Sequence, residues 1–248
     1  MSTPLIPNLL ILGGTTEANA LAKTLSEQGV AATYSYAGRV DTPRPQPLPT
    51  RVGGFGGVEG LIHYLRENTI THVVDATHPF AAQMSRNAIE ACTATQIPLA
   101  ALTRPPWVAG PGDTWQHVAD VPAAVAALAG APRRVFLATG RLHLEVFAAQ
   151  PQHHYLLRLV DEPDGVPLPQ ADVVVARGPF TEESDRALMQ HHGTQLVVSK
   201  NAGGTGARAK LDAARSLGLP VLMIDRQSLP QRVELSHVSQ VLDWLAHS

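Results

Sequence analysis

The chain of 248 residues has little of several things, and each shortage excludes a class of protein. It contains one cysteine, Cys92, so no disulfide can form within the chain. Cys92 lies in an apolar stretch with helical spacing, which favours a buried core thiol over a nucleophile. Charged residues make up only 16% of the chain and the formal net charge is −2, which argues against a disordered chain and against nonspecific nucleic-acid binding.

Long apolar runs and metal-binding patterns are also missing. No stretch approaches the roughly 20 apolar residues that a membrane-spanning helix requires. Residues 1–7 lack a basic segment followed by an apolar one, so we expect no secretory signal and a soluble, cytoplasmic protein. Neither a cysteine pair nor a His-x-x-x-His pair is present, so we expect no metal site. The pairs His153-His154 and His191-His192 are expected at the surface, because adjacent side chains on a strand or helix point apart.

What the sequence does have is a repeated alternation of short, continuous apolar runs and helical patterns. This alternation is typical of α/β proteins whose parallel sheets are covered on both faces. The expected strands are residues 9–12, 31–36, 71–75, 98–102, 135–138, 155–160, 173–176, 195–199 and 221–224. The expected helices are residues 17–27, 58–67, 80–94, 181–191, 207–217 and 236–246, with a short one ending near residue 149.

A stretch dense in proline and glycine interrupts this alternation near the middle of the chain. We interpret residues 105–111 as a linker, with an ordinary long loop as the alternative. The sequence therefore predicts two Rossmann-like α/β domains, residues 1–104 and 112–248, with mainly parallel sheets and a cleft between them.

The turn after the first expected strand suits a pyrophosphate group. It reads Gly13-Gly14-Thr15-Thr16-Glu17, and glycines let a backbone approach phosphates while the following helix offers N–H groups and positive potential. The pattern departs from G-x-G-x-x-G, since its third and sixth positions are Thr15 and Ala18. A tight turn without a ligand is the alternative.

The end of the second expected strand separates the two nicotinamide cofactors. An NAD site normally carries an acid there to hold the ribose, whereas this chain has Ser35, Gly38 and Arg39 in that stretch. Serine and arginine suit the 2′-phosphate of NADPH, because a guanidinium forms charge-assisted bonds with phosphate. A solvated Arg39 is the alternative. The missing acid also argues against a methyltransferase-like protein that uses S-adenosylmethionine.

Two further segments of the first half are candidate cofactor contacts. Four glycines and an aromatic residue precede a helix at Gly53-Gly54-Phe55-Gly56-Gly57, which fits either close approach to a cofactor or a flexible hinge. The second segment, residues 75–78, ends an apolar strand, where open α/β sheets bind their ligands.

Within that second segment we expect Ala76 and Thr77 to contact the cofactor. Asp75 and His78 are candidate catalytic residues at the nicotinamide end of the site. A buried hydrogen-bond acceptor is the alternative for Asp75, and a helix cap is the alternative for His78.

The second half places cations and glycines after its expected strands. This arrangement suits a substrate with several carboxylates, although solvated surface charge is the alternative for each cation. The candidate substrate contacts are Thr139, Gly140, Arg141, Arg177, Lys200, Asn201, Gly203 and Gly204.

Taken together, these motifs resemble the precorrin-6A reductase family of cobalamin biosynthesis over nearly the whole chain. Ala202 departs from the pattern, because we would expect serine at this position in many relatives. The motifs that carry the resemblance are Ile11–Ala18, Tyr34–Arg39, Arg51–Gly57, Val74–Ala81, Thr139–Arg141, Arg177–Phe180 and Lys200–Gly204.

The resemblance implies an NADPH-dependent reduction of one ring double bond of precorrin-6A, a tetrapyrrole, to give precorrin-6B. It leaves open the cobalt-containing counterpart of the anaerobic branch, and it suggests product transfer to neighbouring pathway enzymes, with no nucleic acid and no membrane as partner. Lys200, or His78 through a water, would stabilise charge or supply the proton. The competing hypotheses are a reductase of another polycarboxylate and a noncatalytic tetrapyrrole carrier.

Overall fold

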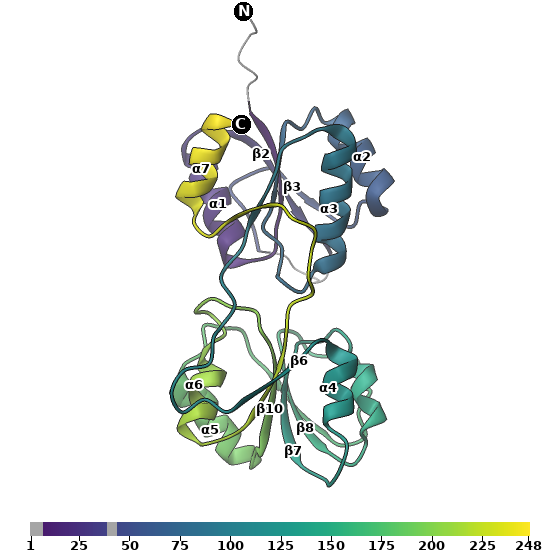
Figure 1. The fold of residues 1–248 in the computed structure, drawn as a ribbon, viewed down its shortest axis with the longest axis vertical. Coiled ribbons are helices and arrows are strands. Elements are labelled where there is room, and N and C mark those ends of the chain that lie inside the picture. The colour runs from purple at the N-terminus through teal and green to yellow at the C-terminus, as the bar shows by residue number, and fades with distance from the viewer. Residues whose placement is uncertain (1–6, 39–43) are drawn as a thin grey trace, which may run out of the picture. The chain divides into compact units, whose positions relative to one another are not determined.

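A computed structural model describes residues 7–38 and 44–248, and the chain forms two compact units (Figure 1). Unit 1 is Met1–Arg104 together with Ser228–Ser248, and unit 2 is Pro105–Gln227. Within the described residues each unit contains one six-stranded sheet, and all strand pairs are parallel. The predicted α/β class with parallel sheets is confirmed.

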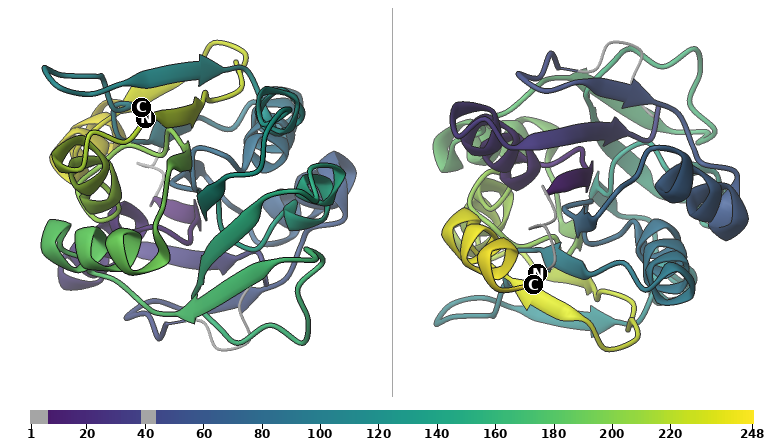
Figure 2. Two further views of the ribbon diagram at one scale, coloured as in Figure 1. Left: turned by 90° about the horizontal axis from the view of Figure 1, so that it is seen from below. Right: turned by 90° about the horizontal axis from the view of Figure 1, so that it is seen from above.

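In unit 1 the strand order is β12-β5-β4-β1-β2-β3. Helices α1 and α7 cover one face of this sheet, and α2 and α3 cover the other (Figure 1; Figure 2, right). The strands are β1 (Asn8–Leu12), β2 (Ala31–Tyr36), β3 (Thr50–Val52), β4 (His72–Asp75), β5 (Leu99–Leu102) and β12 (Val233–Leu235). The helices are α1 (Thr16–Glu27), α2 (Gly57–Glu67), α3 (Ala82–Thr95) and α7 (Val238–His247).

The first strand shows why these strands are continuous apolar runs. Leu9 and Ile11 pack with the core residues of α1 and α7, whereas Leu10 and Leu12 pack with those of α2 and α3. Successive side chains of a strand point to opposite faces of the sheet, and here both faces are covered by helices. Alternation with polar residues would leave one helix pair without an apolar surface to bury.

In unit 2 the strand order is β6-β11-β10-β7-β8-β9. Helices α5 and α6 cover one face, and α4 covers the other together with the 3₁₀-helix η1 (Figure 2, left). The strands are β6 (Trp115–Val118), β7 (Arg134–Ala138), β8 (His154–Leu159), β9 (Ala171–Val175), β10 (Leu196–Lys200) and β11 (Val221–Ile224). The helices are α4 (Val121–Ala127), η1 (Leu144–Ala149), α5 (Glu182–His192) and α6 (Ala209–Ser216).

Both sheets have the strand order of a dinucleotide-binding fold, with one exchange. Strands β1–β5 have the order 3-2-1-4-5 in unit 1, and strands β7–β11 have the same order in unit 2. The sixth position, at the edge beside the fifth strand, is taken by β12 in unit 1 and by β6 in unit 2. After β5 the chain supplies β6 to the sheet of unit 2, and after β11 it supplies β12 to the sheet of unit 1. Residues 228–248 therefore fold with unit 1, whereas the sequence placed them in the second domain.

A second prediction, that both pairs of adjacent histidines lie at the surface, is wrong for one residue of each pair. His153 and His192 are buried, with 0% and 4% of their surfaces exposed, whereas His191 is exposed. Adjacent side chains do point apart, but one of each pair then points into the core. The ring of His153 is satisfied there, since its nitrogens contact the Arg133 N–H and the Leu128 carbonyl oxygen.

The structure also describes the single cysteine and the length and polarity of the helices. Cys92 is buried in the core between α3 and α2, as predicted, and burial, aided by the charge of Asp75, raises the pKa of its thiol to about 12. Over residues 7–38 and 44–248, no helix is both long and apolar enough to cross a bilayer.

The buried His192 makes the stability of unit 2 depend on pH. Burial, followed by the nearby charges of Arg134 and His154, lowers the pKa of His192 to about 4 from an ordinary value of 6.5. Between these two values the unfolded chain takes up a proton that the folded chain does not, so stability falls as the pH falls. We expect H192N to remove about 3 kcal/mol of this acid sensitivity in urea unfolding.

The exposed neighbour provides the matched control. H191N should keep most of the wild-type dependence of the unfolding free energy on pH between 6.5 and 4, because the charge of His191 is the smallest of the causes that shift the pKa of His192. A pH profile for H192N that runs parallel to the wild type would contradict this account.

Candidate functional site

Unit 1 contains a pocket of ≈ 440 Å³, within the range of about 300–1,000 Å³ typical of small-molecule sites. It lies at the carboxyl ends of β1, β2, β3 and β4, where the strand order reverses between β1 and β4. Open α/β sheets bind their ligands at this switch point. The lining residues are Gly13, Gly14, Tyr36, Ala37, Gly38, Val52, Gly54, Phe55, Gly56, Gly57, Thr77, His78, Ala81, Gln83, Met84 and Asn87.

About half of the predicted cofactor contacts line this pocket. The lining set contains Gly13, Gly14, Gly38, Gly54, Phe55, Gly56 and Thr77, and also the candidate catalytic residue His78. Other predicted residues lie behind the wall, since Thr15, Ser35 and Ala76 are buried. Arg39 lies outside the described residues. Sequence reasoning missed the contribution of α3, whose Gln83, Met84 and Asn87 follow helical spacing and gave no signal of a site.

The first turn is held by internal hydrogen bonds. Gly13 donates its N–H to the Ser35 carbonyl, and Gly14 donates its N–H to the Tyr34 hydroxyl at 2.9 Å. Tyr34 is fully buried, burial raises the pKa of its phenol, and the hydroxyl donates to Asn19 Oδ1 at 2.9 Å. A Cβ on Gly13 would lie 2.2 Å from the Tyr34 ring. Gly13 is therefore glycine because the tyrosine fills the space of a side chain.

The N-cap residue of α1, Thr15, also has internal partners. The Thr15 hydroxyl accepts from the Ala18 N–H, capping the helix, and donates to the Ala76 carbonyl at 2.8 Å. Thr15 thereby joins the turn after β1 to the loop after β4.

Glu17 in the first turn of α1 forms an ion pair with Arg104 at 2.9 Å. Burial raises the pKa of Glu17, but a hydrogen bond from its own N–H and the charge of Arg104 lower it more, so the net shift is downward. A carboxylate thus occupies the amino end of α1, the position where sequence reasoning expected an anionic ligand.

The glycine-rich loop before α2 is organised by Arg51, which sequence reasoning did not select. Its guanidinium donates to Ser35 Oγ at 2.7 Å and to the carbonyls of Gly53 and Gly54 at 2.9 and 3.1 Å. It also lies 3.8 Å from the centroid of the Phe55 ring. The signal available in the sequence was a basic residue two positions before the glycine run, and in the structure Arg51 pairs with Ser35 near the end of β2.

The glycines of this loop leave open space at the pocket. A Cβ added at Gly53, Gly54, Gly56 or Gly57 would meet no atom within 4 Å. Helix α2 begins at this loop with Gly56 as its N-cap and without a side-chain cap. Its first amide groups are thus presented towards the pocket that Gly56 and Gly57 line.

Asp75 is the centre of a buried network. Its carboxylate is paired with Arg232 and accepts from Ser85 Oγ at 2.6 Å and Thr77 Oγ1 at 2.7 Å. Only 2% of the Asp75 side chain is exposed. A carboxylate held by a guanidinium and two hydroxyls is suited to positioning the Thr77 loop, which differs from the catalytic role expected from the sequence.

His78 lines the pocket beside that loop. Its Nδ1 accepts from the Phe80 N–H at 3.2 Å, and helix α3 begins only at Ala82. The ring thus stabilises the turn before the helix and also faces the pocket, which combines the two alternatives left open by the sequence.

In unit 2 the corresponding switch point lies between β7 and β10. Two predicted substrate contacts meet there, since Lys200 Nζ donates to the Thr139 carbonyl at 2.9 Å. The Thr139 hydroxyl is buried and has no hydrogen-bond partner within the described part of the chain. An unsatisfied hydroxyl beside an ammonium group is the arrangement expected where a polar ligand binds.

Other predicted substrate contacts serve the fold or face solvent. Asn201 is buried, and its amide accepts from the Trp107 N–H at 2.7 Å and donates to the Trp107 carbonyl at 3.0 Å. Gly203 packs closely, because a Cβ there would lie 2.2 Å from the Pro105 carbonyl oxygen. Arg141 is exposed, and Arg177, with 61% of its side chain exposed, is paired with Asp161.

The chain matches the family model described as "Precorrin-6x reductase CbiJ/CobK" over residues 8–246. It is 60% identical over 239 residues to "Precorrin-6A reductase" of Rhodobacter capsulatus, covering 96% of this chain and 95% of that protein. A solved structure named "CobK precorrin-6A reductase" superposes with a TM-score of 0.93 at 59% identity, covering 97% and 96% of the two chains. "Cobalt-precorrin-6A reductase" of Priestia megaterium is 29% identical over 256 residues, covering 96% and 98%.

Two glycines of the pocket wall, Gly13 and Gly54, differ in whether their surroundings leave room for a side chain. We expect G13A to lower the free energy of unfolding by about 1–3 kcal/mol, because its methyl group would collide with the Tyr34 ring. G54A is the matched control, since nothing lies within 4 Å of its Cβ, and its stability should stay within about 0.5 kcal/mol of the wild type. Equal losses for both variants in urea unfolding would contradict the packing account of Gly13.

Proposed function

We propose that this chain, which belongs to the precorrin-6x reductase family, uses NADPH as the hydride donor in the pocket of unit 1. As a member of that family it is an oxidoreductase of cobalamin biosynthesis that acts on a carbon–carbon bond, reducing precorrin-6A to precorrin-6B. The choice of NADPH rests on the residues found near the end of β2. Ser35 there lies against the Arg51 guanidinium, in the position where an NAD site carries an acid.

The pyrophosphate is best accommodated by the amino end of α2. The Glu17 carboxylate lies at the amino end of α1, whereas α2 starts from open glycines without a side-chain cap. Uncapped amide groups with the positive end of the helix dipole are a suitable site for phosphate. This assignment moves the phosphate from the first turn, where the sequence predicted it, to residues 53–57.

The 2′-phosphate of NADPH is assigned to the end of β2. Arg51 carries a charge there, its guanidinium is held by the buried Ser35 hydroxyl, and Arg39 follows shortly after in the sequence. Guanidinium groups form charge-assisted bonds with phosphate oxygens, and the two hydroxyls of an NADH ribose would not use them.

The tetrapyrrole is assigned to the carboxyl ends of β7 and β10 in unit 2. Lys200 and the unsatisfied Thr139 hydroxyl supply a cation and a polar group at the switch point of that sheet. Arg141 and Arg177 are exposed cations on loops after β7 and β9, suited to carboxylate arms. The cleft between the two halves stays a prediction from the sequence.

When bound, the nicotinamide supplies the hydride, and the protein orients the reactants and excludes water. The ring system also needs a proton at its second carbon or at a nitrogen. We assign that proton to Lys200, or to His78 through a water, because each lies at a strand end in its site. Asp75 positions the Thr77 loop, since its carboxylate is fully engaged with Arg232, Ser85 and Thr77.

The aerobic branch is favoured over the cobalt-dependent one. The relative named for precorrin-6A shares 60% identity with this chain, and the relative named for the cobalt complex shares 29%. We also propose a cytoplasmic enzyme that passes its product to neighbouring enzymes of the pathway, as the sequence resemblance implies.

The proposed function is tested by anaerobic incubation with precorrin-6A and either dinucleotide, followed by absorption. We expect the wild type to convert precorrin-6A faster with NADPH than with NADH. R39A should raise KM for NADPH by roughly 10- to 100-fold and leave KM for NADH nearly unchanged, since it removes a charge-assisted bond to the 2′-phosphate.

Arg44 provides the control for a nearby charge. Its side chain is exposed, and its carbonyl accepts from the Tyr36 hydroxyl through the backbone, so R44A should resemble the wild type with both dinucleotides. Equal effects of R39A on the two KM values would remove the assignment to NADPH. Dinucleotide binding without any conversion would favour the noncatalytic carrier.

The two candidate proton sources are tested by single-turnover kinetics of K200A and H78A. We expect kcat to fall about 100-fold in at least one of them, because a positioned acid contributes about that much. K23A, which removes a surface lysine paired with Glu27 on α1, is the control and should keep wild-type turnover. Near-normal kcat in both K200A and H78A would discard a catalytic role for these side chains.

A further inference from the structure

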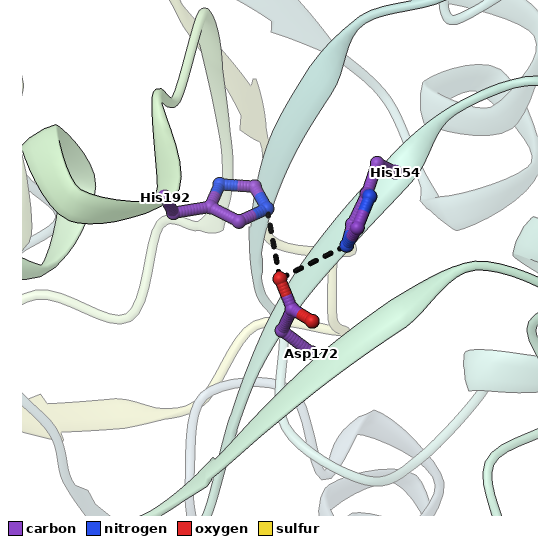
Figure 3. Close-up of side chains that lie close together, drawn as sticks. All are labelled: His154, Asp172 and His192. Atoms are coloured by element: carbon purple, nitrogen blue, oxygen red, sulfur yellow. Dashed lines mark hydrogen bonds and ion pairs between the residues drawn. The ribbon is translucent and has the colours of Figure 1, made fainter.

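Three side chains with metal-ligand chemistry converge in unit 2, away from the two sites above (Figure 3). His154 begins β8, Asp172 lies on β9, and His192 ends α5. Nε2 of His154 is 2.9 Å from Oδ2 of Asp172, and Nε2 of His192 is 3.9 Å from the same oxygen. The ligand atoms of the three residues all lie within 4.8 Å of one another.

The ring of His192 supplies a second, independent observation. Only 2% of this side chain is exposed, and its Nε2 has no hydrogen-bond partner within residues 7–38 and 44–248. Figure 3 shows this nitrogen turned towards Asp172. A buried polar atom without a partner destabilises a folded protein, so a group that binds it is expected.

The far side of the His192 ring is held by another partner, since its Nδ1 lies 3.0 Å from the Thr194 hydroxyl. An outer contact of this kind orients a metal-binding imidazole and directs its Nε2 towards the ion. Nδ1 of His154 lies 3.4 Å from Nη1 of Arg134, and because both groups are donors once Nε2 binds a metal, this contact opens on metal binding.

We propose that His154, Asp172 and His192 bind one Zn²⁺ ion. Two imidazole nitrogens and a carboxylate oxygen are a ligand set that zinc takes at about 2.0–2.2 Å, with a water as fourth ligand. Ligands of a tetrahedral ion at that distance are about 3.3 Å apart. The observed separations of 2.9 and 3.9 Å lie on either side of this value, so small side-chain rotations suffice.

Arg134 sets the strength of the site. Its Nη2 lies 3.7 Å from Oδ2 of Asp172, so a guanidinium already neutralises part of the carboxylate charge. Its Nε donates to the His192 carbonyl and thereby holds the end of α5 in place. We therefore expect micromolar affinity, weaker than that of a structural zinc site with four protein ligands.

The ion has a structural role. The cluster lies near the amino ends of β8 and β9, whereas Thr139 and Lys200 lie at the carboxyl ends of β7 and β10. Strand β9 is an edge strand of its sheet, and zinc would fasten it to β8 and to the end of α5. The proposal is independent of the cofactor and substrate assignments.

The sequence predicted no metal site because the three ligands are far apart along the chain. His154 and His192 come from the pairs expected at the surface. They are brought together only by the fold, which places the end of α5 beside the first residues of β8 and β9.

The test is calorimetric titration of chelator-treated full-length protein with ZnCl₂, with unfolding temperature as a second readout. We expect one ion per chain and an unfolding temperature that rises by several degrees with zinc. H154A and D172N, at the two more exposed positions, should weaken binding by about 100-fold or more and abolish the rise. Titration with Co²⁺ should give the visible absorption of a tetrahedral complex in the wild type alone.

The controls are two other histidines that each face one acid. H63A removes a partner of Glu67 at 3.1 Å, and H117A removes a partner of Asp225 at 2.8 Å. Both variants should bind zinc like the wild type. Loss of binding in H63A or H117A, equal binding in H154A and D172N, or no binding by the wild type would each overturn the proposal.

Discussion

The buried carboxylate of Asp75 connects the parts of unit 1 on which the candidate pocket depends. A charge with 2% of its side chain exposed must be paired, and its partner Arg232 lies 157 residues further along the chain. The same carboxylate holds Ser85 on α3 and Thr77 in the loop after β4. One ion pair thus fixes the pocket wall and requires the C-terminal segment to return to unit 1.

That return explains the exchange of edge strands. Because unit 2 ends at Gln227 and residues 228–248 belong to unit 1, β12 completes the first sheet beside β5, and β6 fills the equivalent position beside β11 in the second. Helix α7 then buries Val241 against α1 and β1. Each unit therefore has a switch point at its centre, with glycines and Thr77 in the first and Thr139 and Lys200 in the second.

The sequence predicted the central strands well, because a run such as Leu9–Leu12 is apolar on both faces and needs helices on both. It missed β3, β6 and β12, which are short edge strands with half-exposed or exposed residues and therefore carry no apolar run. It located the loops of the candidate site from their glycines and strand ends. It missed Arg51, the Arg232 partner of Asp75 and the meeting of His154 with His192, since only tertiary packing creates these contacts.

The central claim is that the dinucleotide lies in the pocket of unit 1 at the carboxyl ends of β1, β2 and β4. A crystal structure of the protein soaked with NADP⁺ tests it most directly. We predict density with the 2′-phosphate beside Ser35 and Arg51, the pyrophosphate at the start of α2, and the nicotinamide near Thr77 and His78. Dinucleotide bound in unit 2, or at the amino ends of the unit 1 strands, would contradict the account.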